Sequence, residues 1–142
     1  MPRNISVIVI NASRQRVWDM LTKPEYVKLW QFGSDLITTW EPESPIRFVA
    51  EWNGQTFEQW GHVLVYKPYE AIQYSLFAPR PDLEDKPENY FVMCYELSDQ
   101  EDNTRLVITQ IDNRPDAIQE EPQGEENPVL QQLKQLAESN EH

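Results

Sequence analysis

The chain has 142 residues, the length of one ordinary domain, and carries a formal net charge of -12. Aromatic residues make up 11% of it, so the composition excludes a wholly disordered chain. The acidic balance excludes a nucleic-acid binder and a protein attracted to anionic membranes, and no apolar stretch is long enough to predict a transmembrane helix.

The first 30 residues predict one strand followed by two short helices. Residues 5–10 (ISVIVI) form a β-branched run that is typical of a buried strand. Ser13 is a suitable N-cap for a helix over 14–21, in which apolar residues recur at helical spacing. Pro24 then favours the start of a second helix over 24–30, because its fixed φ suits the first helical turn.

Between residues 35 and 113 the apolar residues recur with a period of two, which predicts antiparallel strands. The pair Asn53-Gly54 stands between two aromatic strands and predicts a tight hairpin. With this pair as the turn, Arg47 lies opposite Trp60. The predicted strands cover residues 36–40, 46–52, 56–66, 71–77, 90–97 and 105–111.

The hairpin register separates an apolar face of the sheet from a charged one. The apolar face carries Phe48, Ala50, Trp52 and Phe57. The charged face carries Arg47, Glu51, Glu58 and Trp60. The same parity points a longer row inward: Gly61, Val63, Val65, Ile72, Tyr74, Leu76, Phe91, Met93, Tyr95 and Leu97. Both faces of the last strand are partly apolar, so its orientation stays open.

Two polar segments predict long loops. Residues 78–89 contain three prolines and four acidic residues, and residues 114–127 form an acidic loop. A last helix is predicted over 128–139, with an apolar stripe made of Val129, Leu130, Leu133, Leu136 and Ala137. No internal repeat or composition break divides the chain, so we expect one domain over residues 1–142.

Several short motifs along the chain resemble one known family. They are Ala12-Ser13, Val17-Trp18, Leu21-Thr22-Lys23-Pro24-Glu25, Trp30, Gly61-His62-Val63-Leu64, Ala71-Ile72-Gln73-Tyr74, Tyr95-Glu96-Leu97 and Asn103-Thr104-Arg105-Leu106. With the β-α-α-β6-α order, they resemble the helix-grip fold of the START-like (SRPBCC) superfamily. Within it, the chain is most similar to the family related to the C-terminal domain of the activator of the heat-shock protein 90 ATPase.

The resemblance covers nearly the whole chain and implies an α+β fold. In this fold one curved antiparallel sheet wraps around a C-terminal helix. The chain departs from the family at the start of that helix, where Glu126-Asn127-Pro128 stands in place of an aromatic residue. The helix is also short for the family, which argues against a large enclosed pocket.

The resemblance also implies that the concave face of the sheet lines a cleft for a small apolar, aromatic or lipid-like ligand. Strand parity and family analogy together predict these ligand-binding residues: Trp30, Phe48, Trp52, Phe57, Tyr74, Met93, Tyr95, Ile108, Gln110 and Leu130. Aromatic walls suit a flat ligand, which the tyrosine hydroxyls and Gln110 would orient. Whether the row encloses a hollow cleft or a filled core stays open.

No catalytic or metal-binding constellation can be built from this sequence, because its paired carboxylates all lie in polar loops where nothing would raise their pKa. His62 is the only internal histidine, and no other histidine or cysteine lies near it at ligand spacing. Cys94 is accompanied by neither a base nor an oxyanion motif, and as the only cysteine it indicates a reducing, cytoplasmic location. We therefore expect no catalytic residue, no metal and no cofactor.

The charged face of the sheet carries one apolar strip. Trp60 and Leu64, together with Phe77 on the next strand, are predicted to form it. Two alternatives stay open: Arg47 covers the strip through a cation–π contact, or the strip is a surface for a partner or a second copy of the chain.

Three functions of different classes follow. The leading hypothesis is non-catalytic binding of a small apolar ligand. The second, which rests on the family resemblance, is a chaperone-associated protein similar to the activator of the heat-shock protein 90 ATPase. The third is an enzyme similar to polyketide cyclases or dehydratases, for which only Tyr74 and Tyr95 could supply an acid or a base. The predicted partners are a small apolar molecule and, as alternatives, a chaperone or a second copy of the chain.

Overall fold

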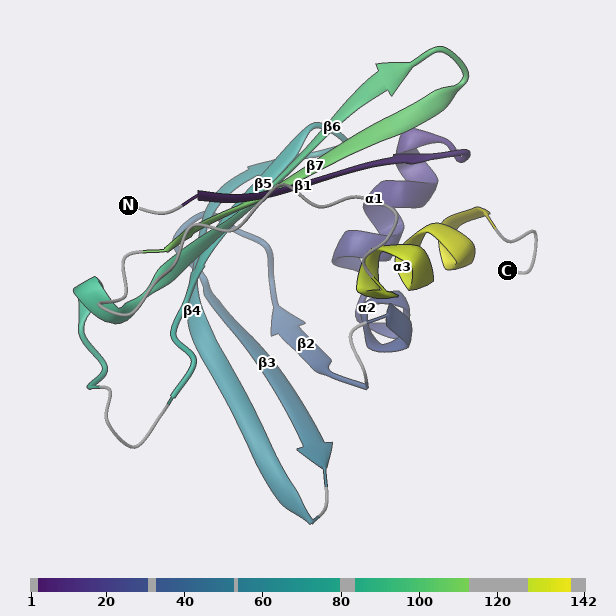
Figure 1. Cartoon of the computed structure of the whole chain (residues 1–142). Coiled ribbons are helices and arrows are strands. Elements are labelled where there is room, and N and C mark those ends of the chain that lie inside the picture. The colour runs from purple at the N-terminus through teal and green to yellow at the C-terminus, as the bar shows by residue number, and fades with distance from the viewer. Residues whose placement is uncertain (1–2, 31–32, 53, 80–83, 113–127, 139–142) are drawn as a thin grey trace.

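One curved antiparallel sheet and three helices make up the part of the chain that the computed structural model describes, residues 3–30, 33–52, 54–79, 84–112 and 128–138. The seven strands of this part lie in the order β1-β7-β6-β5-β4-β3-β2. The helices lie together on the concave side of the sheet (Figure 1). The predicted α+β helix-grip fold is thereby confirmed.

The predicted strands and helices are present, with ends that differ by no more than three residues. The strands are β1 (Arg3–Ile10), β2 (Asp35–Thr38), β3 (Pro45–Trp52), β4 (Gln55–Lys67), β5 (Ala71–Leu76), β6 (Phe91–Gln100) and β7 (Asn103–Asp112). The helices are α1 (Arg14–Thr22), α2 (Pro24–Trp30) and α3 (Pro128–Glu138), with a single 3₁₀ turn, η1 (Pro87–Asn89). The predicted acidic loop over 114–127 lies outside the described residues.

The hairpin register that the sequence predicts is confirmed in the structure. Arg47 of β3 lies opposite Trp60 of β4, and Ala50 lies opposite Phe57. The open question about β7 is also answered, because Ile108 lies opposite Tyr95 of β6. Residues that face each other across antiparallel strands share a face, so the inward side of β7 is the one that carries Leu106, Ile108 and Gln110.

Trp40 departs from the sequence prediction. The pattern placed it at the end of a strand over 36–40, but β2 ends at Thr38. The Trp40 backbone has a positive φ of 63°, which a strand does not allow. Leaving the strand lets its indole ring stack on Tyr66 at 5.7 Å between ring centres and donate a hydrogen bond to the Thr22 carbonyl at 3.0 Å.

The C-terminal end of α3 is attached to α1 and to the end of β1 by polar contacts. Arg16 of α1 donates to the carbonyl oxygens of Leu136 and Ala137 at 3.1 and 3.3 Å. The last carbonyls of a helix have no partner within the helix, so a guanidinium there satisfies them and suits the helix dipole. Glu138 accepts a hydrogen bond from the Asn11 backbone at 2.7 Å and pairs with Lys134.

We expect Glu138→Gln to lower the melting temperature at neutral pH and to have no effect in acid. Burial raises the pKa of Glu138, but the hydrogen bonds from Lys134 and Asn11 outweigh it, and the net pKa is lowered. A carboxyl whose pKa is lower in the folded than in the unfolded chain stabilises the fold at pH values above its unfolded pKa. That contribution is lost as the pH falls through the folded pKa. We expect a deficit of about 1 kcal/mol, or roughly 4 °C, at pH 7.

Thermal melts of both proteins across pH test this prediction. The two melting temperatures should converge once the pH has fallen below the pKa of the folded carboxyl. Glu101→Gln is the control, because Glu101 is an exposed residue in the turn between β6 and β7. A deficit that stays constant from pH 7 into acid would contradict the assigned charge interaction.

Candidate ligand-binding site

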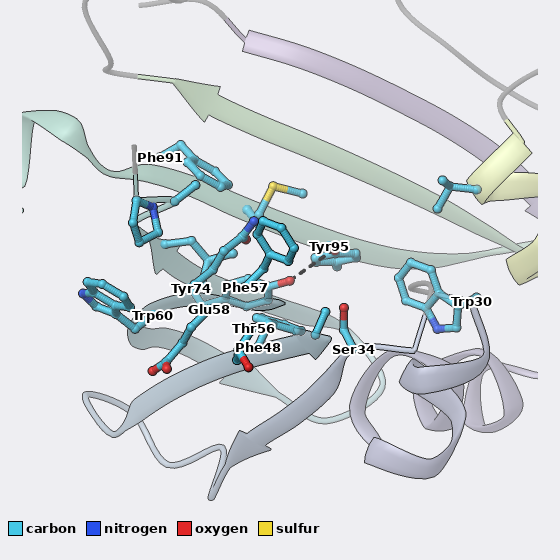
Figure 2. A pocket seen from close by; sticks show the side chains of 17 residues that line it. Trp30, Ser34, Phe48, Thr56, Phe57, Glu58, Trp60, Tyr74, Phe91 and Tyr95 are labelled. Atoms are coloured by element: carbon cyan, nitrogen blue, oxygen red, sulfur yellow. Dashed lines mark hydrogen bonds between the residues drawn. The ribbon is translucent and has the colours of Figure 1, made fainter. Parts of the chain in front are cut away.

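A cavity of about 800 Å³ lies against the concave face of the sheet and is partly open to solvent (Figure 2). Strands β3, β4, β5 and β6 form most of its wall, and α2 and α3 each contribute one residue. Its lining residues are Trp30, Ser34, Phe48, Ala50, Thr56, Phe57, Glu58, Gln59, Trp60, Tyr74, Leu76, Ala78, Pro79, Phe91, Met93, Tyr95 and Val129. The space is therefore hollow rather than filled by a packed core, which the sequence pattern left open.

Six of the ten predicted ligand-binding residues line this cavity. They are Trp30, Phe48, Phe57, Tyr74, Met93 and Tyr95. Five of these come from four strands, β3 to β6, at inward-facing positions, as the period of two predicts. Phe57 is half exposed, which places it at the mouth, whereas Tyr74 and Tyr95 are 4% and 6% exposed and form the deep end.

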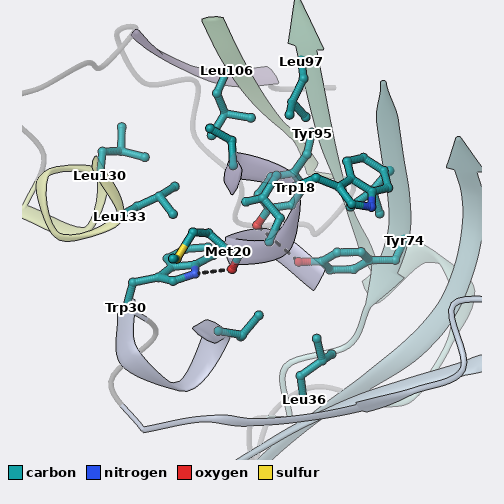
Figure 3. Close-up of a cluster of buried hydrophobic side chains, with 14 of the residues drawn as sticks. Trp18, Met20, Trp30, Leu36, Tyr74, Tyr95, Leu97, Leu106, Leu130 and Leu133 are labelled. Carbon is teal, nitrogen blue, oxygen red and sulfur yellow. Dashed lines mark hydrogen bonds between the residues drawn. The ribbon is translucent and has the colours of Figure 1, made fainter. Parts of the chain in front are cut away.

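Four predicted residues are not among the described residues that line the cavity. Ile108 packs against the buried core. Gln110 donates a hydrogen bond to the Asp112 carboxylate at 3.3 Å, so its amide has a partner within the protein. Leu130 is buried in the core opposite the sheet (Figure 3). The side chain of Trp52 lies outside the described residues.

The cavity also contains residues that the sequence reasoning did not select. Three of them are on the predicted inward face of the sheet, so strand alternation could have identified them: Ala50, Leu76 and Phe91. Val129 reaches the cavity where Leu130 was expected, because one residue turns a helix by about 100° and the apolar stripe alone does not fix its rotation.

Glu58 and Trp60 line the cavity although they lie on the charged face of the hairpin. Ser34, Thr56, Gln59, Ala78 and Pro79 complete the set that was missed. Strand parity predicts the face of a side chain but does not predict where a cavity opens, because the opening depends on how the sheet curves.

The deep end of the cavity is an aromatic wall centred on Tyr74. Its ring lies 5.7 Å from that of Phe48 and 5.9 Å from that of Tyr95, with the two tyrosine rings stacked. The Tyr74 hydroxyl donates to the Tyr95 hydroxyl at 3.2 Å. Burial raises the pKa of Tyr74 well above 10 and also raises that of Tyr95. Both hydroxyls are therefore neutral at physiological pH, so they are hydrogen-bond donors and weak acids, not bases.

The rim beside Trp60 is held by one carboxylate. Asp85 accepts a hydrogen bond from the Trp60 indole at 3.0 Å and one from the Tyr90 hydroxyl at 2.6 Å. Phe77 lies between the two rings, 5.4 Å from each. Arg47 pairs with Glu58 at 2.6 Å. In the predicted outer strip, Trp60 is thus packed by Phe77 and Asp85. Arg47 pairs with Glu58 instead of covering the strip, so the predicted cation–π contact is wrong.

Other chemically capable side chains lie away from the cavity. Cys94 alternates with Met93 and Tyr95 and so lies on the opposite face of β6, where burial raises its thiol pKa. His62 is exposed to solvent. Among the described residues no group of three or more His, Cys, Asp or Glu side chains could hold a metal ion. None of the helices described is long and apolar enough to span a membrane.

Comparisons with known proteins place these features in a family. The family described as Activator of Hsp90 ATPase homolog 1-like protein matches residues 11–138. The protein ChR145 of Cytophaga hutchinsonii, whose solution structure is known, is 31% identical, with a TM-score of 0.69 over 82% of this chain and 80% of that one. No protein with a curated function matches the sequence.

Two more distant solved structures share the fold. The protein NE0264 of Nitrosomonas europaea is 17% identical, with a TM-score of 0.72 over 96% of this chain and 94% of that one. The Aha1 dimer of Colwellia psychrerythraea is 18% identical, with a TM-score of 0.61 over 83% of this chain and 81% of that one. At these identities the likeness concerns the fold alone.

Proposed function

The chain belongs to the Activator of Hsp90 ATPase homolog 1-like family, and we propose that it binds a small apolar or aromatic molecule in its cavity without transforming it. The observation that carries this proposal is the hollow space itself. A volume of about 800 Å³ falls within the range of about 300–1,000 Å³ that is usual for small-molecule sites. Aromatic rings and two buried hydroxyls supply the mixture of apolar wall and few polar groups that such sites have.

The lining favours binding over catalysis. Its one charged side chain among the described residues is Glu58, which is occupied by Arg47. The raised pKa values of Tyr74 and Tyr95 keep both hydroxyls protonated. A cyclase or dehydratase that begins by removing a proton needs a base, and neither neutral tyrosine can act as one.

The test is uptake of the neutral dye N-phenyl-1-naphthylamine, whose fluorescence rises in apolar surroundings. Ala50 lines the cavity, whereas its neighbour Val49 belongs to the opposite face. We expect Ala50→Phe to fill the space and weaken dye binding by about tenfold, and Val49→Phe to leave it unchanged. No fluorescence increase with the native chain, or equal binding by both variants, would count against the proposal.

Chaperone association is a second candidate function. The family match over residues 11–138 favours it, and the name of the Colwellia relative refers to the same activator. It rests on family membership and not on a feature of the cavity, so it ranks below ligand binding. Retention of purified Hsp90 by the immobilised chain, undiminished by Ala50→Phe, would support it.

A further inference from the structure

The two buried tyrosine hydroxyls of the cavity have one O–H donor more than the hydrogen bond between them uses. Tyr74 and Tyr95 come from adjacent strands, and their hydroxyl oxygens are 3.2 Å apart (Figure 2). Each hydroxyl has one hydrogen to donate. Within the described residues the two hydroxyls hydrogen-bond only to each other. Whichever hydroxyl donates, the other O–H is left without an acceptor, and a buried donor without a partner is unfavourable.

Little of either tyrosine is exposed to bulk solvent. Tyr74 is 4% exposed and Tyr95 is 6% exposed. The nearest rings are those of Phe48 and Trp40, at 5.7 and 6.3 Å from the ring of Tyr74. A ligand atom that reaches the deep end of the cavity would therefore meet a directed donor in an otherwise aromatic setting, where a hydrogen bond is electrostatically stronger than in water.

The charge of the lining disfavours anions. The described residues that line the cavity include no lysine, arginine or histidine. Glu58, the acidic one, already binds Arg47 at 2.6 Å. A carboxylate placed at the deep end would be buried without a cation, which costs far more than one hydrogen bond returns.

From these contacts we propose that the Tyr74–Tyr95 pair makes the cavity selective for uncharged aromatic molecules that carry a hydrogen-bond acceptor, such as a carbonyl oxygen, at their buried end. This inference rests on the proposed ligand-binding function and specifies the chemical class of its ligand. Either hydroxyl can supply the proton, so the pair acts as one unit.

The experiment compares three naphthalenes of similar size as competitors of the neutral dye. They are 2-acetylnaphthalene, which has an acceptor, 2-isopropenylnaphthalene, a hydrocarbon analogue of the same size, and 2-naphthoate, an anion. Tyr74→Phe/Tyr95→Phe removes both donors and keeps both rings. We expect the ratio of ketone affinity to hydrocarbon affinity to fall about fivefold in this double variant. The ratio cancels the different hydrophobicity of the two probes.

Two further comparisons sharpen the test. Tyr69→Phe, a half-exposed turn residue that does not line the cavity, is the matched control and should keep the native ratio. We expect 2-naphthoate to bind the native chain at least about tenfold more weakly than the ketone. Removing both hydroxyls together leaves neither one unpaired, so we expect the double variant to fold.

The outcomes separate the two proposals. If none of the neutral probes displaces the dye from the native chain, the proposed function itself fails. Suppose that both neutral probes displace the dye, but the affinity ratio in the double variant equals that in the native chain, or the anion binds as tightly as the ketone. The proposed selectivity of the tyrosine pair is then overturned, while the proposed binding function is retained. The carbonyl stretching frequency of bound 2-acetylnaphthalene gives an independent readout on the native chain. It should lie below its value in alkane solvent, and an unshifted band would likewise overturn the selectivity.

Discussion

Gly61→Ala is expected to unfold the chain or to reduce its free energy of unfolding by about 3 kcal/mol or more. A Cβ atom built on Gly61 would lie 1.8 Å from the carbonyl oxygen of Ser75 and 2.5 Å from its carbonyl carbon. These are backbone atoms of β5, so they cannot rotate away as a side chain would. Strands β4 and β5 would have to separate beside the cavity wall that carries Tyr74.

Urea denaturation of the purified variant measures this loss. Gly54→Ala is the matched control, because Gly54 has a φ of 77° but open space around its Cβ position. It should cost about 1 kcal/mol, the price of a left-handed backbone for a residue with a Cβ. If both variants were destabilised equally, the close approach of the two strands at Gly61 would be refuted.

Leu133→Ala is expected to cost about 2–5 kcal/mol of folding stability. Leu133 is fully buried, and together with Leu130 it points from α3 into the core (Figure 3). Truncation removes apolar contacts and leaves a void that the sheet cannot fill without moving. Val129 of the same helix lines the cavity, so a loosened α3 should also weaken dye binding.

Chemical denaturation and dye titration of one sample test both parts of this prediction. Gln132→Ala is the control, since Gln132 lies on the exposed side of α3 and alanine is a good helix former. We expect it to change stability by less than about 0.5 kcal/mol. Unchanged stability in Leu133→Ala would mean that α3 does not pack on the sheet as described.

Much of the sheet could be predicted because its signals are local. The Asn53-Gly54 turn and the period of two together place Arg47 opposite Trp60, as found. A one-residue slip would turn every apolar side chain of the hairpin to the other face, so the pattern tolerates one register only. The same parity predicted that Phe48 and Phe57 share a face, and both line the cavity.

The rest of the site depends on contacts between segments that are distant in sequence. Trp60 donates a hydrogen bond to Asp85, which lies 25 residues further along the chain. This contact has no periodicity or spacing that a single strand could reveal.

The sequence by itself determined the register of the β3–β4 hairpin and the aromatic character of the concave face, because turn residues and alternation act within one or two strands. The class of fold followed from the resemblance of its motifs to a known family. Only the tertiary structure decided that this face encloses a cavity of about 800 Å³ and that the Tyr74 and Tyr95 hydroxyls meet at its deep end. Hollow and filled interiors share one hydrophobic pattern. What separates them is the curvature of the sheet and the distance at which the helices pack on it.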